Sequence, residues 1–120
     1  MTDFRPHRKL VVWQKAMELV GEVYKATHTF TKIEEYGLSS QMRRAAVSVP
    51  SNLAEGAARK GSKEFKQFLN IAQGSISELD TQVELANMLG YMSSEMHKEL
   101  MLKMTALSKM LFGLSNSVKG

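Results

Sequence analysis

Between residues 10 and 28, apolar side chains recur every three or four positions, which is the spacing of one face of an α-helix. Two such stripes run side by side. The first contains Trp13, Ala16, Met17, Val20, Tyr24 and Thr27, and the second contains Val12, Ala16, Leu19, Val23 and Ala26. Two adjoining stripes make a broader apolar face than a single core requires. We therefore predict that the first stripe faces the core and that the second, including Leu19 and Val23, faces a neighbouring subunit.

A second helical pattern ends near residue 57, and its start can be placed in two ways. Thr31 and Glu34 have the spacing of a capping box, which predicts a start there. Gly37 interrupts the pattern, so a start nearer Ser39 is the alternative. The predicted core stripe of this helix contains Leu38, Met42, Ala45, Val49, Leu53 and Ala57.

This second helix carries Pro50 in its interior. A proline there removes one backbone donor and crowds the preceding turn, at a cost of roughly 3 kcal/mol. We expect Ser48, Ser51 and Asn52 to offset this cost by bonding to freed backbone groups. Glu55 belongs to the same group of polar residues as Ser48 and Asn52. We interpret the hydrogen bonds of this group as structural and not as a ligand site.

Two further helices complete the pattern. The third is predicted to run from Ser62, as its N-cap, to Gly90, and the fourth to begin at Ser93 or Ser94. Their core stripes contain Phe65, Phe68, Leu69, Ala72, Ile76, Leu79, Val83, Ala86 and Leu89, and then Met96, Leu100, Met104, Leu107, Leu111, Leu114 and Val118. Four helices joined by short turns, without a strand pattern, predict an all-α, antiparallel up-down-up-down four-helix bundle. A chain of 120 residues is the size of one such domain, so we assign residues 1–120 to it.

Each helix also carries apolar residues that its own core stripe does not use. The predicted oligomer interface consists of these: Leu19, Val23, Val47, Leu85 and Phe112. Because exposed apolar residues on every helix favour self-association, we predict that the bundle forms a homo-oligomer.

Candidate catalytic or metal-binding residues are sparse. The chain has no cysteine, and His7, His28 and His97 are scattered over different segments. A di-iron site in a bundle needs inward Glu-x-x-His pairs, and no Glu-x-x-His is present. The sequence therefore predicts no metal site, no cofactor and no enzymatic activity. The absence of a signal peptide and of a long apolar run predicts a cytoplasmic protein without a membrane partner.

The net charge of +4 comes from the first half of the chain. Residues 1–61 carry ten Lys and Arg against six Asp and Glu, whereas residues 62–120 carry six against six. Residues 1–9 are predicted to form a flexible basic arm. The predicted nucleic-acid-binding residues are Arg43, Arg44, Arg59, Lys60, Lys63 and Lys66. Such a set can bind phosphates without reading sequence, although a solvated face or inter-subunit ion pairs are the competing interpretation.

Three stretches carry a family resemblance: LVVWQKAMELVGEVY, YGLSSQMRRAAVSVPSNLAEG and KEFKQFLNIAQGSISELDTQ, followed by an LGYMS turn. Over about residues 3–118 the chain resembles the bacterial four-helix-bundle family (S23-like) that includes proteins encoded in intervening sequences of large-subunit ribosomal RNA genes. The resemblance implies a cytoplasmic, non-enzymatic homo-oligomer, with a five-membered ring as the favoured form. It also implies kinship with the accessory protein of diversity-generating retroelements. Thr31 stands where the family often has proline.

Two functional hypotheses follow. The first is an oligomeric protein that associates with nucleic acid, most simply RNA, through the basic surface. The second is a scaffold or adaptor whose partner is another protein.

Overall fold

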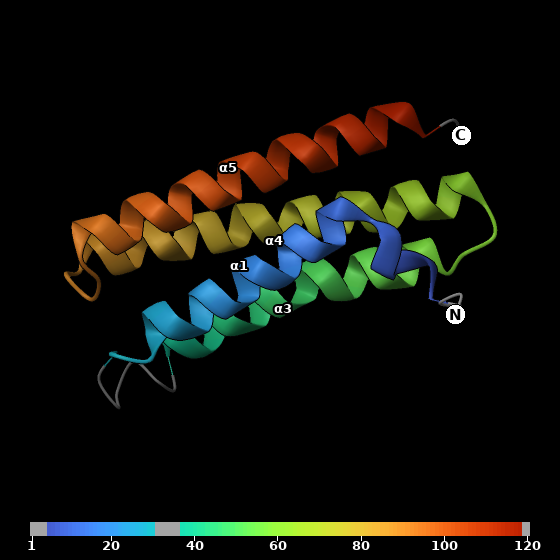
Figure 1. Cartoon of the computed structure of the whole chain (residues 1–120). Coiled ribbons are helices and arrows are strands. Elements are labelled where there is room, and N and C mark those ends of the chain that lie inside the picture. The colour runs from blue at the N-terminus through green and yellow to red at the C-terminus, as the bar shows by residue number, and fades with distance from the viewer. Residues whose placement is uncertain (1–4, 31–36, 119–120) are drawn as a thin grey trace.

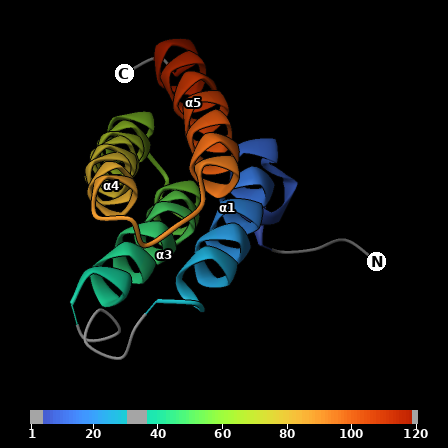
Figure 2. The same ribbon diagram turned by 90° about the vertical axis from the view of Figure 1, so that its left-hand side faces the viewer.

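The computed structural model describes residues 5–30 and 37–118, and within them the chain forms an all-α bundle. Its helices are α1 (Val11–Thr27), α3 (Leu38–Ala57), α4 (Ser62–Met88) and α5 (Ser94–Ser117), preceded by a short 3₁₀ helix, η1 (Pro6–Lys9). Successive α-helices run in opposite directions (Figure 1) and occupy four corners when the bundle is viewed near its end (Figure 2). Each packs mainly against two neighbours, α1 and α4 both lying against α3 and α5. The predicted four-helix bundle is confirmed.

The centre of the bundle is filled by one apolar cluster. The fully buried large side chains are Leu19, Met42, Leu53, Leu69, Leu79, Leu100, Met104, Leu107, Leu111, Val23, Val49 and Val83. The core stripes predicted for α3, α4 and α5 are confirmed over their middle turns. Leu89 is the exception on α4, because the helix ends at Met88 and leaves Leu89 exposed in the turn.

The prediction for α1 is wrong: the second stripe, which was assigned to a neighbouring subunit, faces the core, and the first stripe is partly exposed. Leu19 is 1% exposed and Val23 0% exposed, so both lie in the subunit's own core and neither can contact another subunit. Met17 and Tyr24 of the other stripe are nearly half exposed. The stripe with alanine and branched aliphatic side chains faces the core, between α3 and α5. The stripe with aromatic rings borders α3, where Tyr24 can keep its polar edge in water.

Residues 5–9 also differ from the predicted flexible arm. Pro6 starts η1, a position that suits its fixed φ and its missing N–H group. The His7 ring meets the Trp13 ring edge-on with centroids 4.9 Å apart, and Gln14 Nε2 donates to Arg8 O at 2.9 Å. These contacts hold η1 against α1, and η1 also packs on α3.

The helix ends follow local chemistry. Helix α3 begins at Leu38, which agrees with the later of its two predicted starts, whereas Thr31 and Glu34 lie outside the described residues. Ser93 caps α5 as predicted, its hydroxyl accepting from Met96 N at 3.1 Å. Helix α4 begins at Ser62 itself, after Gly61, rather than being capped by Ser62. Gly90 closes α4 with φ of 80°, a left-handed conformation that favours glycine.

Helix α3 continues through the buried Pro50 and packs closely on α4. Asn52 Nδ2 donates to Ser48 O at 2.7 Å, and the hydroxyls of Ser48 and Ser75 are hydrogen-bonded between the two helices. Asn52 therefore bonds to the backbone, as predicted, and its acceptor is Ser48 O. The carbonyl that lacks a helical donor because of Pro50 is that of Ala46, so this bond does not replace the lost one.

Candidate nucleic-acid interface

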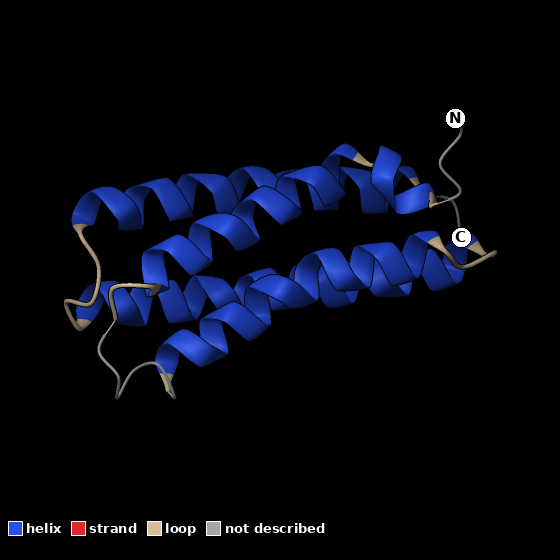
Figure 3. Ribbon diagram, turned by 60° about the horizontal axis from the view of Figure 1, so that its bottom comes forward, coloured by secondary structure: helices blue, strands red, loops and turns tan. Residues whose placement is uncertain are grey.

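Basic side chains gather at one end of the bundle. There η1 lies beside the second half of α3, so the N-terminal residues and the α3–α4 turn are brought together (Figures 1 and 3). We call this surface the cationic end and define it by Arg5, Arg8, Lys9, Arg59, Lys60, Lys63 and Lys66. Glu64 is the one acidic residue in segments 5–9 and 58–66. The surface therefore has a strong positive excess.

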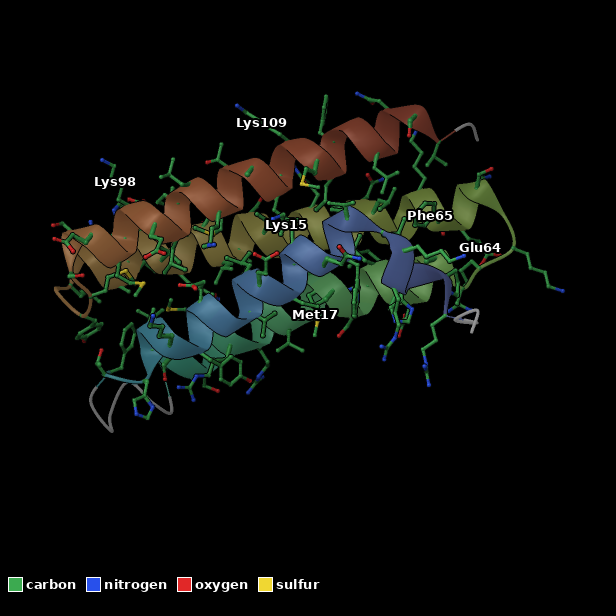
Figure 4. All side chains as sticks on the ribbon, viewed as in Figure 1. Lys15, Met17, Glu64, Phe65, Lys98 and Lys109 are labelled. Carbon is green, nitrogen blue, oxygen red and sulfur yellow. The ribbon has the colours of Figure 1, made fainter. Side chains whose placement is uncertain are left out.

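Arg59 has a structural role within the cationic end. Its Nε lies 3.9 Å from Glu64 Oε2, and its guanidinium lies 5.1 Å from the centre of the Phe68 ring. Both partners are on α4, so Arg59 ties the end of α3 to the beginning of the next helix. Glu64 and Phe65 mark this end in Figure 4. Lys60 and Lys63 are exposed, and no ion pair to either is found within residues 5–30 and 37–118.

Arg43 and Arg44 lie near the opposite end of α3. Sixteen residues separate Arg43 from Arg59, which corresponds to about 24 Å along a helix. Arg43 is half-buried: its Nε donates to Thr27 Oγ1 at 2.8 Å, and its guanidinium lies 4.8 Å from the centre of the Tyr24 ring. Arg43 thus joins α3 to α1. The six predicted nucleic-acid-binding residues form two separate groups, and only the group at the α3–α4 turn joins the basic N-terminal segment.

The outer side of α3 is hollowed. We call this depression the α3 groove; it has a volume of about 750 Å³ and is lined by Tyr24, Ser40, Arg43, Arg44, Val47, Ser48, Ser51, Asn52 and Glu55. A smaller apolar hollow of about 340 Å³ continues it toward η1, lined by His7, Trp13, Met17, Val20, Val47, Pro50, Ser51 and Ala54. Glu55 is exposed in the groove rather than buried.

The remaining predicted interface residues are exposed but not adjacent. Val47 is 39% exposed in the α3 groove, Leu85 is 40% exposed on α4, and Phe112 is 65% exposed on α5. Other exposed apolar residues were not predicted for an interface: Val11, Met17, Tyr24, Ile71, Met88, Leu89 and Leu102. Met17, Tyr24 and Leu89 were missed because they had been assigned to core stripes. Ile71 lies on the same side of α4 as Leu85, fourteen residues away, so the helical period could have identified it.

Other polar clusters are few. His97 Nε2 lies 2.7 Å from Glu84 Oε1 and links the start of α5 to α4. Within the described segments no three His, Asp or Glu side chains are placed to hold a metal ion. The same segments contain no helix with the length and apolar character needed to cross a membrane.

Residues 8–113 match the family model of the 23S rRNA-intervening sequence protein. The chain belongs to this family. The match includes α1 and α3–α4 entirely, and therefore both groups of basic residues, and it confirms the resemblance seen in the sequence.

The bundle of this 23S rRNA-intervening sequence family member is also found in a solved structure. The crystal structure of a protein of unknown function from the S23 ribosomal protein family of Bacteroides thetaiotaomicron is similar, with a TM-score of 0.82. The alignment covers 89% of this chain and 96% of that chain, at 22% sequence identity. At this identity the likeness establishes the fold. No curated protein matches the chain.

Proposed function

We propose that this protein is a non-enzymatic, cytoplasmic RNA-associated protein that contacts phosphates through the cationic end. The observation that carries the proposal is the placement of η1 beside the α3–α4 turn, which joins two basic segments distant in the sequence. We choose RNA as the nucleic acid to test because the family's description refers to 23S rRNA.

The chemistry of the cationic end suits backbone contacts. Lysine and arginine side chains that neutralise phosphates release counterions, and this gives affinity without reading base sequence. The aromatic rings nearby are engaged within the subunit, Phe68 under Arg59 and Trp13 beside His7. Base stacking, which single-strand binders use, therefore has little surface available here. The favoured ligand is a structured RNA whose backbone presents several phosphates together.

Self-association is part of the proposal. We favour a ring-like homo-oligomer, a homopentamer in its simplest form, whose axis runs along the bundles. All cationic ends would then lie on one rim. Several weak phosphate-binding surfaces held together bind one RNA much more tightly than a single copy, because each later contact is intramolecular.

Charge reversal at the cationic end tests the proposed contact. We expect Lys60→Glu/Lys63→Glu to weaken binding of a labelled structured RNA at least tenfold in a gel-shift titration. The matched control is Lys98→Glu/Lys109→Glu, which changes the net charge equally on the outside of α5 (Figure 4). An equal loss in both variants, or no loss in either, would contradict the assignment of the cationic end.

The exposed apolar residues favour a protein-binding scaffold as the second candidate. Leu102 is 64% and Phe112 65% exposed on α5, outside both the cationic end and the α3 groove. Capture of partners from the native host, with and without nuclease, separates the two functions. A protein partner that stays bound after nuclease treatment, together with absent RNA binding, would favour the scaffold.

A further inference from the structure

Glu64 brings a negative charge into the cationic end, where it is paired with Arg59 (Figure 4). Its Oε2 lies 3.9 Å from Arg59 Nε, and the two side chains are 62% and 47% exposed. This distance is too long for a hydrogen bond, so only the attraction between the two charges joins them. Exposed ion pairs of this kind are weak, because water and salt screen them. The pair can therefore separate at small cost.

The Arg59 guanidinium is also held by an aromatic ring, independently of Glu64. It lies 5.1 Å from the centre of the Phe68 ring. Phe68 is fixed in turn by the close approach of α3, because a Cβ atom added at Gly56 would lie only 2.7 Å from Phe68 Cβ. A cation–π contact leaves the N–H donors of a guanidinium available for an anion. Arg59 therefore stays in place when Glu64 moves away.

The donors of Arg59 are not saturated within the subunit. Across residues 5–30 and 37–118, its guanidinium donates no hydrogen bond, and Glu64 is its one ion-pair partner. A guanidinium carries five N–H donors in a planar fork that matches the oxygens of a phosphate. Two anions can thus occupy the same cation, the Glu64 carboxylate in the unbound protein and a phosphate in the complex with RNA.

The start of α4 gives Glu64 a structural role as well. It is the acidic residue in the first turn of α4, where a carboxylate suits the helix dipole. Glutamine has the same shape without the charge. If the helix dipole were the whole role, Glu64→Gln would lower stability slightly and leave the affinity for RNA unchanged. The two roles can therefore be separated by measurement.

We propose that Glu64 competes with RNA phosphates for Arg59 and thereby limits the affinity of the cationic end. In the unbound protein the carboxylate neutralises Arg59, and in the complex a phosphate takes its place on the guanidinium. The inference rests on the proposed RNA contact and identifies the residue that tunes it. A single phosphate gains little from this exchange. An RNA already held by Lys60 and Lys63 brings its next phosphate to Arg59 intramolecularly, so the competition favours a ligand with several phosphates.

Gel-shift titration of a labelled RNA hairpin tests the competition. Glu64→Gln should bind the hairpin at least threefold more tightly than the wild type. In the wild type, the displaced carboxylate takes up a cation as RNA binds, which cancels about one of the cations that the RNA releases. The plot of the logarithm of the association constant against that of the salt concentration should therefore steepen by about 0.7–0.9 in Glu64→Gln.

The matched control is Glu99→Gln, which removes the same charge from an exposed position on α5 and should bind the hairpin like the wild type. A second comparison separates competition from the general effect of charge. In an Arg59→Met background, which keeps an apolar contact with Phe68, adding Glu64→Gln should change the affinity less than twofold, because the contested cation is gone. The comparison is repeated in Arg59→Gln, with helicity checked by circular dichroism.

Two results would overturn the proposal. The first is a Glu64→Gln variant that binds the hairpin no more tightly than the wild type. The second is an equal gain with and without Arg59, which shows that the lost charge acts on the lysines alone. Failure of the proposed function gives a different result, since Lys60→Glu/Lys63→Glu would then bind RNA like the wild type.

Discussion

At the scale of single residues, the two arginines with aromatic partners serve mainly to join helices. Arg43 links α3 to Thr27 and Tyr24 of α1, and Arg59 links the end of α3 to α4. The Thr27 hydroxyl also donates to Val23 O at 2.8 Å, so the Arg43 guanidinium meets an acceptor already fixed in place. Basic residues in the family motif therefore cannot all be assigned to ligand binding.

Gly56 sets the distance between α3 and α4. A Cβ atom at Gly56 would lie 2.7 Å from Phe68 Cβ and 3.0 Å from Phe65 Cδ1, so Gly56→Ala must displace α4. We expect a loss of about 1–3 kcal/mol in the free energy of unfolding, measured by urea denaturation. Gly113→Ala on α5 is the control, because its Cβ meets nothing within 4 Å. Equal stability of Gly56→Ala and wild type would show that the helices can separate without cost.

At the scale of helices, the sequence predicted all four α-helices, and it identified the core-facing side of those with one apolar stripe but not of α1, which has two. Each of α3, α4 and α5 has a single apolar stripe, so only one side of the helix can pack against the core. In α1 the choice between two stripes depends on how side-chain sizes fit the neighbouring helices α3 and α5, and the periodicity of one helix contains no such information. The ordering of η1 was likewise not predictable, because it depends on a His7–Trp13 contact and on packing against α3.

Gly74 is an exposed glycine inside α4 that the packing of the subunit does not require. A Cβ atom added there meets nothing within 4 Å. We therefore expect Gly74→Ala to raise the free energy of unfolding by about 0.5–1 kcal/mol, because alanine favours the helix. Urea denaturation measures the change, and a lower stability of Gly74→Ala than of the wild type would contradict the expectation.

At the scale of the whole molecule, the charges are arranged along the bundle. The cationic end joins η1 to the α3–α4 turn. Toward the other end acidic and basic residues are mixed: Glu78, Asp80, Glu84, Glu95 and Glu99 lie at the same end as Lys25, Arg43, Arg44, Lys98 and Lys103. The sequence identified the basic residues and the cluster at the α3–α4 turn, but not that the N-terminal basic segment lies beside this turn. Arg43 lies near the start of α3, whereas Arg59 lies in the turn after its end. Arg8 and Lys60 are distant in the sequence yet at the same end, and only the bundle topology reveals that.

The salt dependence of RNA binding tests the central claim, phosphate contact at the cationic end, most directly. The logarithm of the association constant for a structured RNA should fall linearly with the logarithm of the salt concentration, because binding releases counterions. Removing two phosphate contacts in Lys60→Glu/Lys63→Glu should reduce the magnitude of that slope by about 1.5 or more, whereas Lys98→Glu/Lys109→Glu should leave it near the wild-type value. A wild-type affinity that does not depend on salt, or the same slope in all three proteins, would contradict the account.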